Sequence, residues 1–343
     1  MTEILRTNGT SDDIMGAFCS LPEAIYREDP IWAPEAESAV ADCLEDAATG
    51  AITIQAVVAT TGDRPLARAM AILNPQARST TGAAEGWVGL FECEADSAEA
   101  GVEVLGACGQ WLRAHGAVRA LAPRIDALRS GLLIGGFDLP HTILTAHNPP
   151  FYAGILGAAG FEVRTRMLGY TYSRERVPSF PALLPEGIQV RHPHRSRVDD
   201  ELERLEAFQA EVFGGSVGYV PRDRRAAGRM LRRLLPIMDL DLVAIAEDDA
   251  GRIVGFLICL PDVWQRRRPV DRARWVSVGV SPGWRRRGVG IAMGVVILER
   301  LLAKGYQTLD GSWVMEDNRR ARSLVPLLGG EPGRVFALLA KEL

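Results

Sequence analysis

The sequence predicts an α/β protein of two domains that share one order of elements. Segments with strand patterns alternate with segments of helical apolar spacing, which is typical of α/β folds. The order strand–strand–strand–helix–strand–helix–strand occurs twice along 343 residues, a length that suits two domains. Three prolines between residues 174 and 187 indicate a boundary, so we expect domains at 1–176 and 187–343.

The second half has the clearer pattern. Apolar residues at Leu202, Leu205, Phe208 and Val212 follow helical spacing, and Gly305 is a typical residue for ending a helix. A turn at 248–251 joins two apolar runs into a hairpin. In order, we expect strand 188–192, helices 199–213 and 222–238, strands 242–247, 252–260 and 274–280, helix 290–305, strand 307–315, a helix and turn at 318–330, and strand 334–342.

The first half repeats this order with weaker signals. Its long helix ends at Gly116, as the corresponding helix of the second half ends at Gly305. We expect strands 51–60, 64–73 and 85–94, helix 97–116, strand 117–123, a helix and turn at 149–161, and strand 162–173. The sequence therefore predicts a structural repeat without obvious identity between its halves.

Composition and charge exclude several classes of protein. No apolar run reaches the roughly 18 residues that a membrane helix needs, and the first residues lack the pattern of a signal peptide. The five cysteines are scattered and form no CxxC pair, which indicates reduced thiols rather than a disulfide framework or a zinc site. We expect a cytoplasmic protein with no metal and no membrane span.

The charge is unevenly divided between the halves. Residues 1–176 carry −9 and residues 177–343 carry +5, so an anionic ligand is drawn to the second half. The total charge is −4, and the arginine clusters lack interleaved aromatic residues, which disfavours nucleic-acid binding.

Three consecutive arginines precede a Gly-x-Gly at residues 285–290, between a predicted strand and a predicted helix. The N–H groups at the start of a helix are unpaired and carry partial positive charge. Gly288 and Gly290 allow a phosphate to approach the backbone, and Arg285, Arg286 and Arg287 add forked donors. This spacing matches neither GxxxxGK[ST] nor GxGxxG. We therefore expect a cradle for an anion here.

This segment resembles the signature Q/R-x-x-G-x-G/A of the GNAT superfamily of acyl-CoA N-acyltransferases. The segment VSVGVSPGWRRRGVGIAM includes the preceding strand, and WVMEDNRRARSLVPLLGG supplies the Asn-bearing helix expected downstream. The resemblance implies two tandem GNAT-like domains, each with a mixed, mostly antiparallel sheet flanked by helices. It also implies that acyl-CoA or acetyl-CoA is held by one set of residues: Val278, Val280, Arg285, Arg286, Arg287, Gly288, Val289, Gly290 and Asn318.

The first half is similar to the N-terminal half of bacterial tandem-GNAT proteins. The matching segments are DPIWAPE (29–35), VGLFECEAD (88–96), QWLRAHG (110–116), GGFDLP (135–140) and NPPFYAGILGAAGFE (148–162). Its strand-to-helix junction reads EADSAEAG, with acids where arginines are needed. We expect a degenerate domain without a pyrophosphate loop.

The catalytic residues are less sharply indicated than the donor loop. Many GNAT enzymes have a Tyr seven residues after the motif Asn, where this chain has Val325, so the general acid is in doubt. Glu316 is the first candidate base and Asp310 the second, and a water chain is an alternative. Ser323 is a candidate acid, and Tyr219 is a candidate acceptor contact.

These observations predict a bacterial N-acyltransferase that moves an acyl group from acyl-CoA to the amine of a small molecule or peptide. Direct attack is expected, without an acyl-enzyme. Two alternatives remain: a fatty-acyl transferase that draws on acyl-carrier protein and acts on a metabolite or peptide precursor, and an acyl-CoA-binding protein without turnover.

Overall fold

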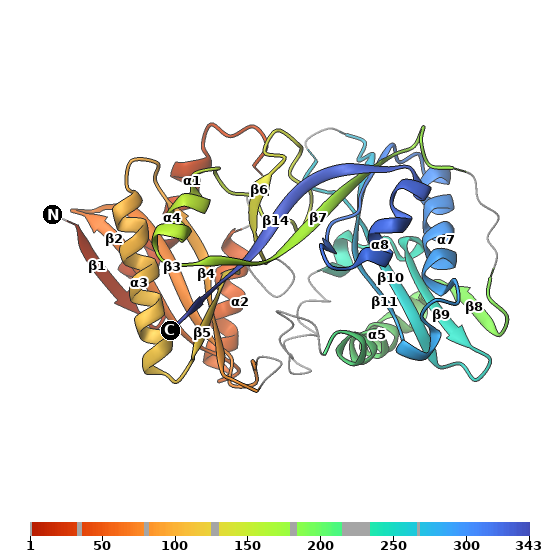
Figure 1. Cartoon of the computed structure of the whole chain (residues 1–343), viewed down its shortest axis with the longest axis horizontal. Coiled ribbons are helices and arrows are strands. Elements are labelled where there is room, and N and C mark those ends of the chain that lie inside the picture. The colour runs from red at the N-terminus through yellow and green to blue at the C-terminus, as the bar shows by residue number, and fades with distance from the viewer. Residues whose placement is uncertain are drawn as a thin grey trace. The chain divides into compact units, whose positions relative to one another are not determined.

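The chain forms two compact units, and both termini belong to the first (Figure 1). The computed structural model describes residues 2–32, 36–78, 82–124, 130–178, 184–214, 234–265 and 268–343. Unit 1 comprises Met1–Met167 and Arg334–Leu343, and unit 2 comprises Leu168–Gly333. Each unit has a mixed, mostly antiparallel sheet flanked by helices, as the sequence predicts.

Unit 1 is built on the sheet order β1-β2-β3-β4-β5-β14, with β6 beside β14. Its one parallel pair among the described strands is β4 with β5. The strands are β1 (Glu3–Thr7), β2 (Thr53–Thr61), β3 (Arg64–Leu73), β4 (Glu85–Cys93), β5 (Arg119–Arg124), β6 (Leu132–Gly135) and β14 (Gly330–Glu342). The helices are α1 (Asp12–Tyr26), α2 (Ala36–Ala48), α3 (Ala98–Ala114) and α4 (Tyr152–Ala158).

Unit 2 repeats the arrangement in the order β7-β12-β11-β10-β9-β8, with β13 beside β7. Among its described strands, β11 and β12 are the parallel pair. The strands are β7 (Glu162–Ser173), β8 (Ile188–Arg191), β9 (Val243–Asp248), β10 (Ile253–Pro261), β11 (Arg272–Val280), β12 (Thr308–Asp310) and β13 (Val314–Met315). The helices are α5 (Val198–Phe213), α7 (Val289–Ala303) and α8 (Arg319–Leu324).

Helices pack on both faces of the unit 2 sheet. Successive residues of a strand point to opposite faces, so neighbouring residues of β10 contact different helices. A Cβ at Gly255 would lie 3.0 Å from Met293 of α7, so this face packs closely on α7. The side chain of the neighbouring Phe256 makes edge-to-face contacts with the rings of Phe208 and Phe213, which both belong to α5. The apolar residues that predicted helices 199–213 and 290–305 are therefore the ones that pack on this sheet.

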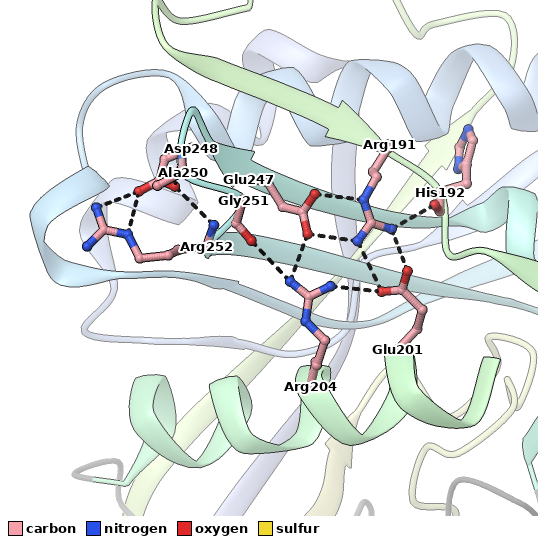
Figure 2. Close-up of polar contacts among 9 residues, drawn as sticks. All are labelled: Arg191, His192, Glu201, Arg204, Glu247, Asp248, Ala250, Gly251 and Arg252. Atoms are coloured by element: carbon pink, nitrogen blue, oxygen red, sulfur yellow. Dashed lines mark hydrogen bonds and ion pairs between the residues drawn. The ribbon is translucent and has the colours of Figure 1, made fainter. Parts of the chain in front are cut away.

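A network of two arginines and two glutamates fixes α5 to β8 and β9 (Figure 2). Arg191 on β8 donates to both oxygens of Glu201 on α5, at 2.9 and 3.1 Å. The same guanidinium donates to Glu247 on β9 at 2.7 and 2.8 Å, and Arg204 of α5 donates to Glu247 at 2.9 Å. Hydrogen bonds from Arg191 hold the pKa of Glu247 below its usual value. Glu247 therefore keeps its charge between its two arginine partners.

The structure differs from the sequence-based expectation in several places. Residues 334–343 form part of unit 1, where β14 pairs antiparallel with β5 and β6, whereas we expected them in the second domain. Residues 168–176 form part of unit 2, whereas we expected them in the first domain. The expected strand 307–315 is divided into β12 and β13. Strand β1 and helices α1 and α2 were not anticipated. Most of the expected helix 222–238 lies outside the described residues, and residues 235–237 form a 3₁₀ turn.

Candidate functional site

Strands β11 and β12 separate soon after they begin to pair. Their parallel register covers three residue pairs and ends at Arg274 opposite Asp310. From Trp275 to Val280, β11 is paired with β10 alone among the described strands, since β13 pairs with β7. One edge of β11 therefore presents unpaired main-chain N–H and C=O groups, which is the edge that an extended ligand with amide groups can pair with.

A bulge lies at the start of this open edge. Ile258 of β10 pairs with Ser277, but the next residue, Cys259, pairs with Trp275, so Val276 is the extra residue on β11. A bulge bends the strand and changes the direction of its neighbours. Val278, a predicted donor contact, is 49% exposed on this strand.

The predicted anion loop follows directly after β11. Its first part is a 3₁₀ turn at Pro282–Trp284, and α7 begins at Val289. Arg286 and Gly288 have φ of +68° and +84°, in the left-handed region that glycine adopts readily and other residues rarely do. The loop therefore turns sharply twice before the helix starts.

The three arginines of the loop are exposed and have different contacts. Arg285 donates through Nε to the carbonyl of Val280 at 3.0 Å, which ties the loop to the end of β11. The guanidinium of Arg287 lies over the Trp284 ring, 5.0 Å from its centroid. Within the described part of the chain, none of the three forms an ion pair with a carboxylate. Their charge is thus available to an anion.

The start of α7 adds unpaired donors to this charge. The first intrahelical hydrogen bond runs from Ala292 N–H to the Gly288 carbonyl, so the N–H groups of Val289, Gly290 and Ile291 have no partner within the helix. Gly288 has no side chain to cap them. These donors and the helix dipole favour an anion at this end. The predicted residues 285–290 are thus brought together as one cationic surface beside the open strand edge.

Three buried polar residues surround the point where β11 and β12 separate. Arg274 and Asp310 occupy directly paired positions and are 1% and 9% exposed. The N–H of Ser312 donates to Oδ1 of Asp310 at 2.8 Å, and Arg274 donates to the Ser312 carbonyl at 3.2 Å. The Ser312 hydroxyl is buried and has no partner among the described residues. The sequence analysis missed Arg274 and Ser312, whose only signal was their position beside the motif strand.

The other predicted catalytic residues lie on α8 or just before it. Glu316 and Ser323 are exposed, and the Ser323 hydroxyl donates to the Arg320 carbonyl at 2.8 Å. Asn318 is the N-cap of α8, where its side chain accepts a hydrogen bond from Ala321 N–H at 3.2 Å. Val325 is buried. Asp310 is thus the one predicted candidate base at the strand separation, and Tyr219 lies outside the described residues.

The corresponding position of unit 1 is filled by a side chain. There the parallel pairing of β4 with β5 runs from Glu85 to Gly89, and the junction after Cys93 carries no arginine. The hydroxyl of Tyr152 accepts from Cys93 N–H at 2.8 Å and donates to Glu92 at 2.8 Å. Burial, followed by the charge of Glu92, raises the pKa of Tyr152 well above its usual value, so the phenol stays protonated. Tyr152 is a core residue.

Within the described ranges, no group of His, Cys, Asp and Glu is arranged to hold a metal ion. A search of the same residues finds no helix long and apolar enough to cross a membrane.

Comparisons with known proteins agree with this geometry. Residues 220–329 match the family described as "Acetyltransferase (GNAT) family". Protein YghO of Escherichia coli is 24% identical over 99% of this chain and 95% of its own length. A protein named bacterial ceramide synthase, from Caulobacter vibrioides, is 24% identical over 95% of this chain and 94% of its own length.

Solved structures show the same fold across the chain. A tandem GNAT protein from the clavulanic acid biosynthesis pathway superposes with a TM-score of 0.62 at 15% identity, covering 100% of this chain and 98% of the other. A GCN5-related N-acetyltransferase from Sphaerobacter thermophilus has a TM-score of 0.57 at 18% identity, covering 99% and 95%. Residues 220–329 thus match the GNAT family, and the chain as a whole is similar in fold to a tandem GNAT protein.

Proposed function

We propose that unit 2 is an N-acyltransferase that moves an acyl group from acyl-CoA to a primary amine by direct attack. The observation that carries this proposal is the open edge of β11, which runs directly into the cationic loop 285–290. Acyl-CoA has a matching order of groups: an anionic pyrophosphate, a pantetheine arm with two amides, and a thioester at its end.

The residues of the loop and strand have distinct roles in holding the donor. The pyrophosphate binds the free N–H groups of Val289 and Gly290, with Arg286 and Arg287 supplying charge. Pantetheine amides pair with the open edge of β11 around Val278. Because the carbonyl of Val280 already accepts a hydrogen bond from Arg285, its contribution is mainly to fix the loop. Asn318, whose side-chain oxygen accepts a hydrogen bond at the start of α8, remains a proposed contact of the donor.

The reaction needs a base for the amine and a proton for the departing thiolate. A primary ammonium has an ordinary pKa of about 10.4, so it must lose a proton before its nitrogen attacks the thioester carbon. The C–N bond forms, the C–S bond breaks, and the CoA thiolate takes up the released proton. We assign the base to Asp310, which lies beside the strand separation, ahead of the exposed Glu316.

The name of one relative indicates which class of acceptor amine to test first. A ceramide is the amide of a fatty acid with a long-chain amino alcohol, and the alignment with the bacterial ceramide synthase spans nearly both chains. This likeness supports a fatty-acyl donor and a long-chain amino alcohol as acceptor, ahead of small polar amines and peptides. The charge of +5 on residues 177–343 also suits an acidic acyl-carrier protein as donor.

Binding without turnover is the second candidate, and Val325 favours it. The buried Val325 stands where many GNAT enzymes have an acidic Tyr, and it supplies no proton. One experiment separates the candidates: the purified chain is incubated with acyl-CoAs from acetyl to palmitoyl and with amines of increasing chain length. Amine-dependent release of CoA thiol, with the amide identified by mass spectrometry, supports the transferase. Saturable acyl-CoA binding without amide, from either CoA or carrier-protein thioesters, supports the second candidate.

A further inference from the structure

We propose that the hydroxyl of Ser312 is a catalytic group that donates a hydrogen bond to the thioester carbonyl of the bound donor. This inference rests on the function proposed for unit 2. It concerns the point where β11 and β12 separate, which adjoins the open edge that would hold the pantetheine arm.

The main chain of Ser312 is held by two buried, charged side chains. Its N–H donates to Asp310 at 2.8 Å and its carbonyl accepts from Arg274 at 3.2 Å. All three residues are at most 9% exposed. Hydrogen bonds to charged groups are shorter and stronger than neutral ones, so the position of Ser312 is fixed before a ligand arrives.

The side chain of Ser312 differs from its main chain in its hydrogen bonding. Ser312 is 3% exposed, and its Oγ has no hydrogen-bond partner among the described residues. A buried polar group without a partner is unfavourable, and such groups in native proteins call for an explanation. A ligand that brings an acceptor oxygen to this point supplies the missing partner.

The register identifies which part of the donor lies there. Arg274 and Asp310 are the last pair before the strands separate, and Ser312 follows Asp310 by two residues as Val276, the bulged residue of β11, follows Arg274. Val276 lies near the start of the open edge, and the cationic loop lies at its other end, after Val280. With pyrophosphate at the loop and pantetheine along the edge, the thioester is the group that reaches Val276 and Ser312.

A donor held in place before the reaction stabilises the negative charge that develops on the carbonyl oxygen. Asp310 and Arg274 act as positioning residues, because they hold the main chain of Ser312. The hydroxyl keeps its proton throughout, so this role needs no oxidant, metal or covalent intermediate.

The test compares Ser312→Ala with Ser20→Ala, whose exposed hydroxyl donates to the Ala17 carbonyl on α1 at 3.2 Å. Loss of the Ser312 hydroxyl is expected to lower kcat by about 100-fold, the size of effect seen for single oxyanion donors. The Kd for CoA should be unchanged, and the melting temperature should not fall, because the hydroxyl has no partner among the described residues. Ser20→Ala should retain wild-type kcat.

Infrared spectroscopy of a donor with ¹³C in the thioester carbonyl gives a second readout that does not need turnover. The stretch should move to higher frequency in Ser312→Ala, since a hydrogen bond to the carbonyl is lost, and should not move in Ser20→Ala. An unchanged stretch with unchanged kcat overturns the proposal, as does a clear loss of stability in Ser312→Ala, which indicates a structural hydroxyl. If the wild type binds acyl-CoA without turnover, the transferase proposal fails. The frequency of the carbonyl stretch then still tests the hydrogen bond from Ser312. If the wild type binds no acyl-CoA, both proposals fail together.

Discussion

Arg285 donates a hydrogen bond of 3.0 Å from Nε to the carbonyl of Val280, the last residue of β11. This contact joins the cationic loop to the strand whose far edge is open, so the anion site and the open edge form one continuous surface within unit 2. The first arginine of the motif is therefore a structural tie as well as a charge.

Replacing Arg285 tests this tie. Arg285→Lys keeps the charge but cannot donate from a guanidinium Nε, and we expect CoA affinity to fall by about tenfold, the equivalent of about 1.4 kcal/mol. Isothermal titration calorimetry with CoA measures the change. Arg300→Lys, on the exposed last turn of α7, is the matched control and should bind as the wild type does. Equal affinities for both variants would show that the Arg285 contact does not shape the site.

A substitution at Gly290 can change ligand binding without changing the stability of the fold. A Cβ there would lie 3.8 Å from Val280, which is ordinary contact, and the φ of Gly290 is not positive. Gly290→Ala should bind CoA within a few-fold of the wild type, because the family signature accepts Ala at this position. Gly290→Glu should lose at least about 100-fold in affinity, because its carboxylate opposes the pyrophosphate at the helix start.

Gly288 is less suitable, although the sequence alone pointed to it. Its φ of +84° is strained for any side chain, at roughly 1–2 kcal/mol, so Gly288→Glu would change stability together with binding. Thermal denaturation of both Glu variants checks this difference. Gly290→Glu should melt close to the wild type and Gly288→Glu clearly below it.

Asp310 and Glu316 can be compared as bases with isosteric amides. Asp310→Asn retains the oxygen that accepts from Ser312 N–H, so the local turn persists while the basic group is lost. We expect kcat to fall by about 100-fold or more. Glu316→Gln, at an exposed site, should retain most of its activity. If Glu316→Gln loses more activity than Asp310→Asn, Glu316 is the base instead. Full activity of both variants would favour a water chain as the base.

Glu201 should be a major contributor to the stability of unit 2. Its carboxylate is 3% exposed and paired with both nitrogens of the Arg191 fork (Figure 2). Glu201→Gln leaves a partly buried guanidinium with one carboxylate fewer, and we expect a loss of about 2–4 kcal/mol in the free energy of unfolding. Asp241→Asn, whose partly exposed carboxylate pairs with Lys304 and Arg195, should cost less than about 1 kcal/mol. Urea denaturation measures both, and equal losses would contradict the assignment.

His147 should make the stability of unit 1 depend on pH. Burial, opposed in part by the hydrogen bond from His147 to Asp29, lowers the pKa of His147, and the charge of Arg334 lowers it further. Arg334 donates to Nδ1 at 3.3 Å, Nε2 lies 2.7 Å from Asp29, and the rings of Tyr26 and His141 pack beside the imidazole. The folded chain therefore holds the imidazole neutral.

The unfolded chain binds this proton near pH 6.5, so the stabilisation is complete above that pH and is lost as the pH falls toward the lower folded pKa. The melting temperature of the wild type should thus decrease between about pH 6.5 and 5 more steeply than that of His147→Gln. Parallel melting curves for the two proteins across this range would show that His147 does not titrate as its surroundings imply.

The sequence predicted local elements well where their apolar pattern was regular. Expected helices 199–213 and 290–305 correspond to α5 and α7 within two residues at each end, and expected strand 274–280 corresponds to β11. The pattern could not place β14, because the pairing of residues 334–343 with β5 depends on partners more than 200 residues away. We did not predict α1, although its apolar residues have helical spacing. This helix contains Pro22, a residue that is unfavourable inside a helix.

The donor loop was predictable because glycines and arginines act there through the backbone and through charge, which the sequence displays directly. The residues around Ser312 were not, because their function depends on which main-chain groups are paired. Only the three-residue pairing of β11 with β12 reveals that Arg274, Asp310 and Ser312 meet where the strands part.

Native mass spectrometry with palmitoyl-CoA shows whether unit 2 holds the donor at the cationic loop. We expect one ligand per chain in the wild type and in Gly290→Ala, and none in Gly290→Glu at the same concentration. Two ligands per chain would contradict the assignment of Tyr152 as the group that fills the corresponding position of unit 1. Undiminished binding by Gly290→Glu would contradict the assignment of the donor site to the cationic loop of unit 2.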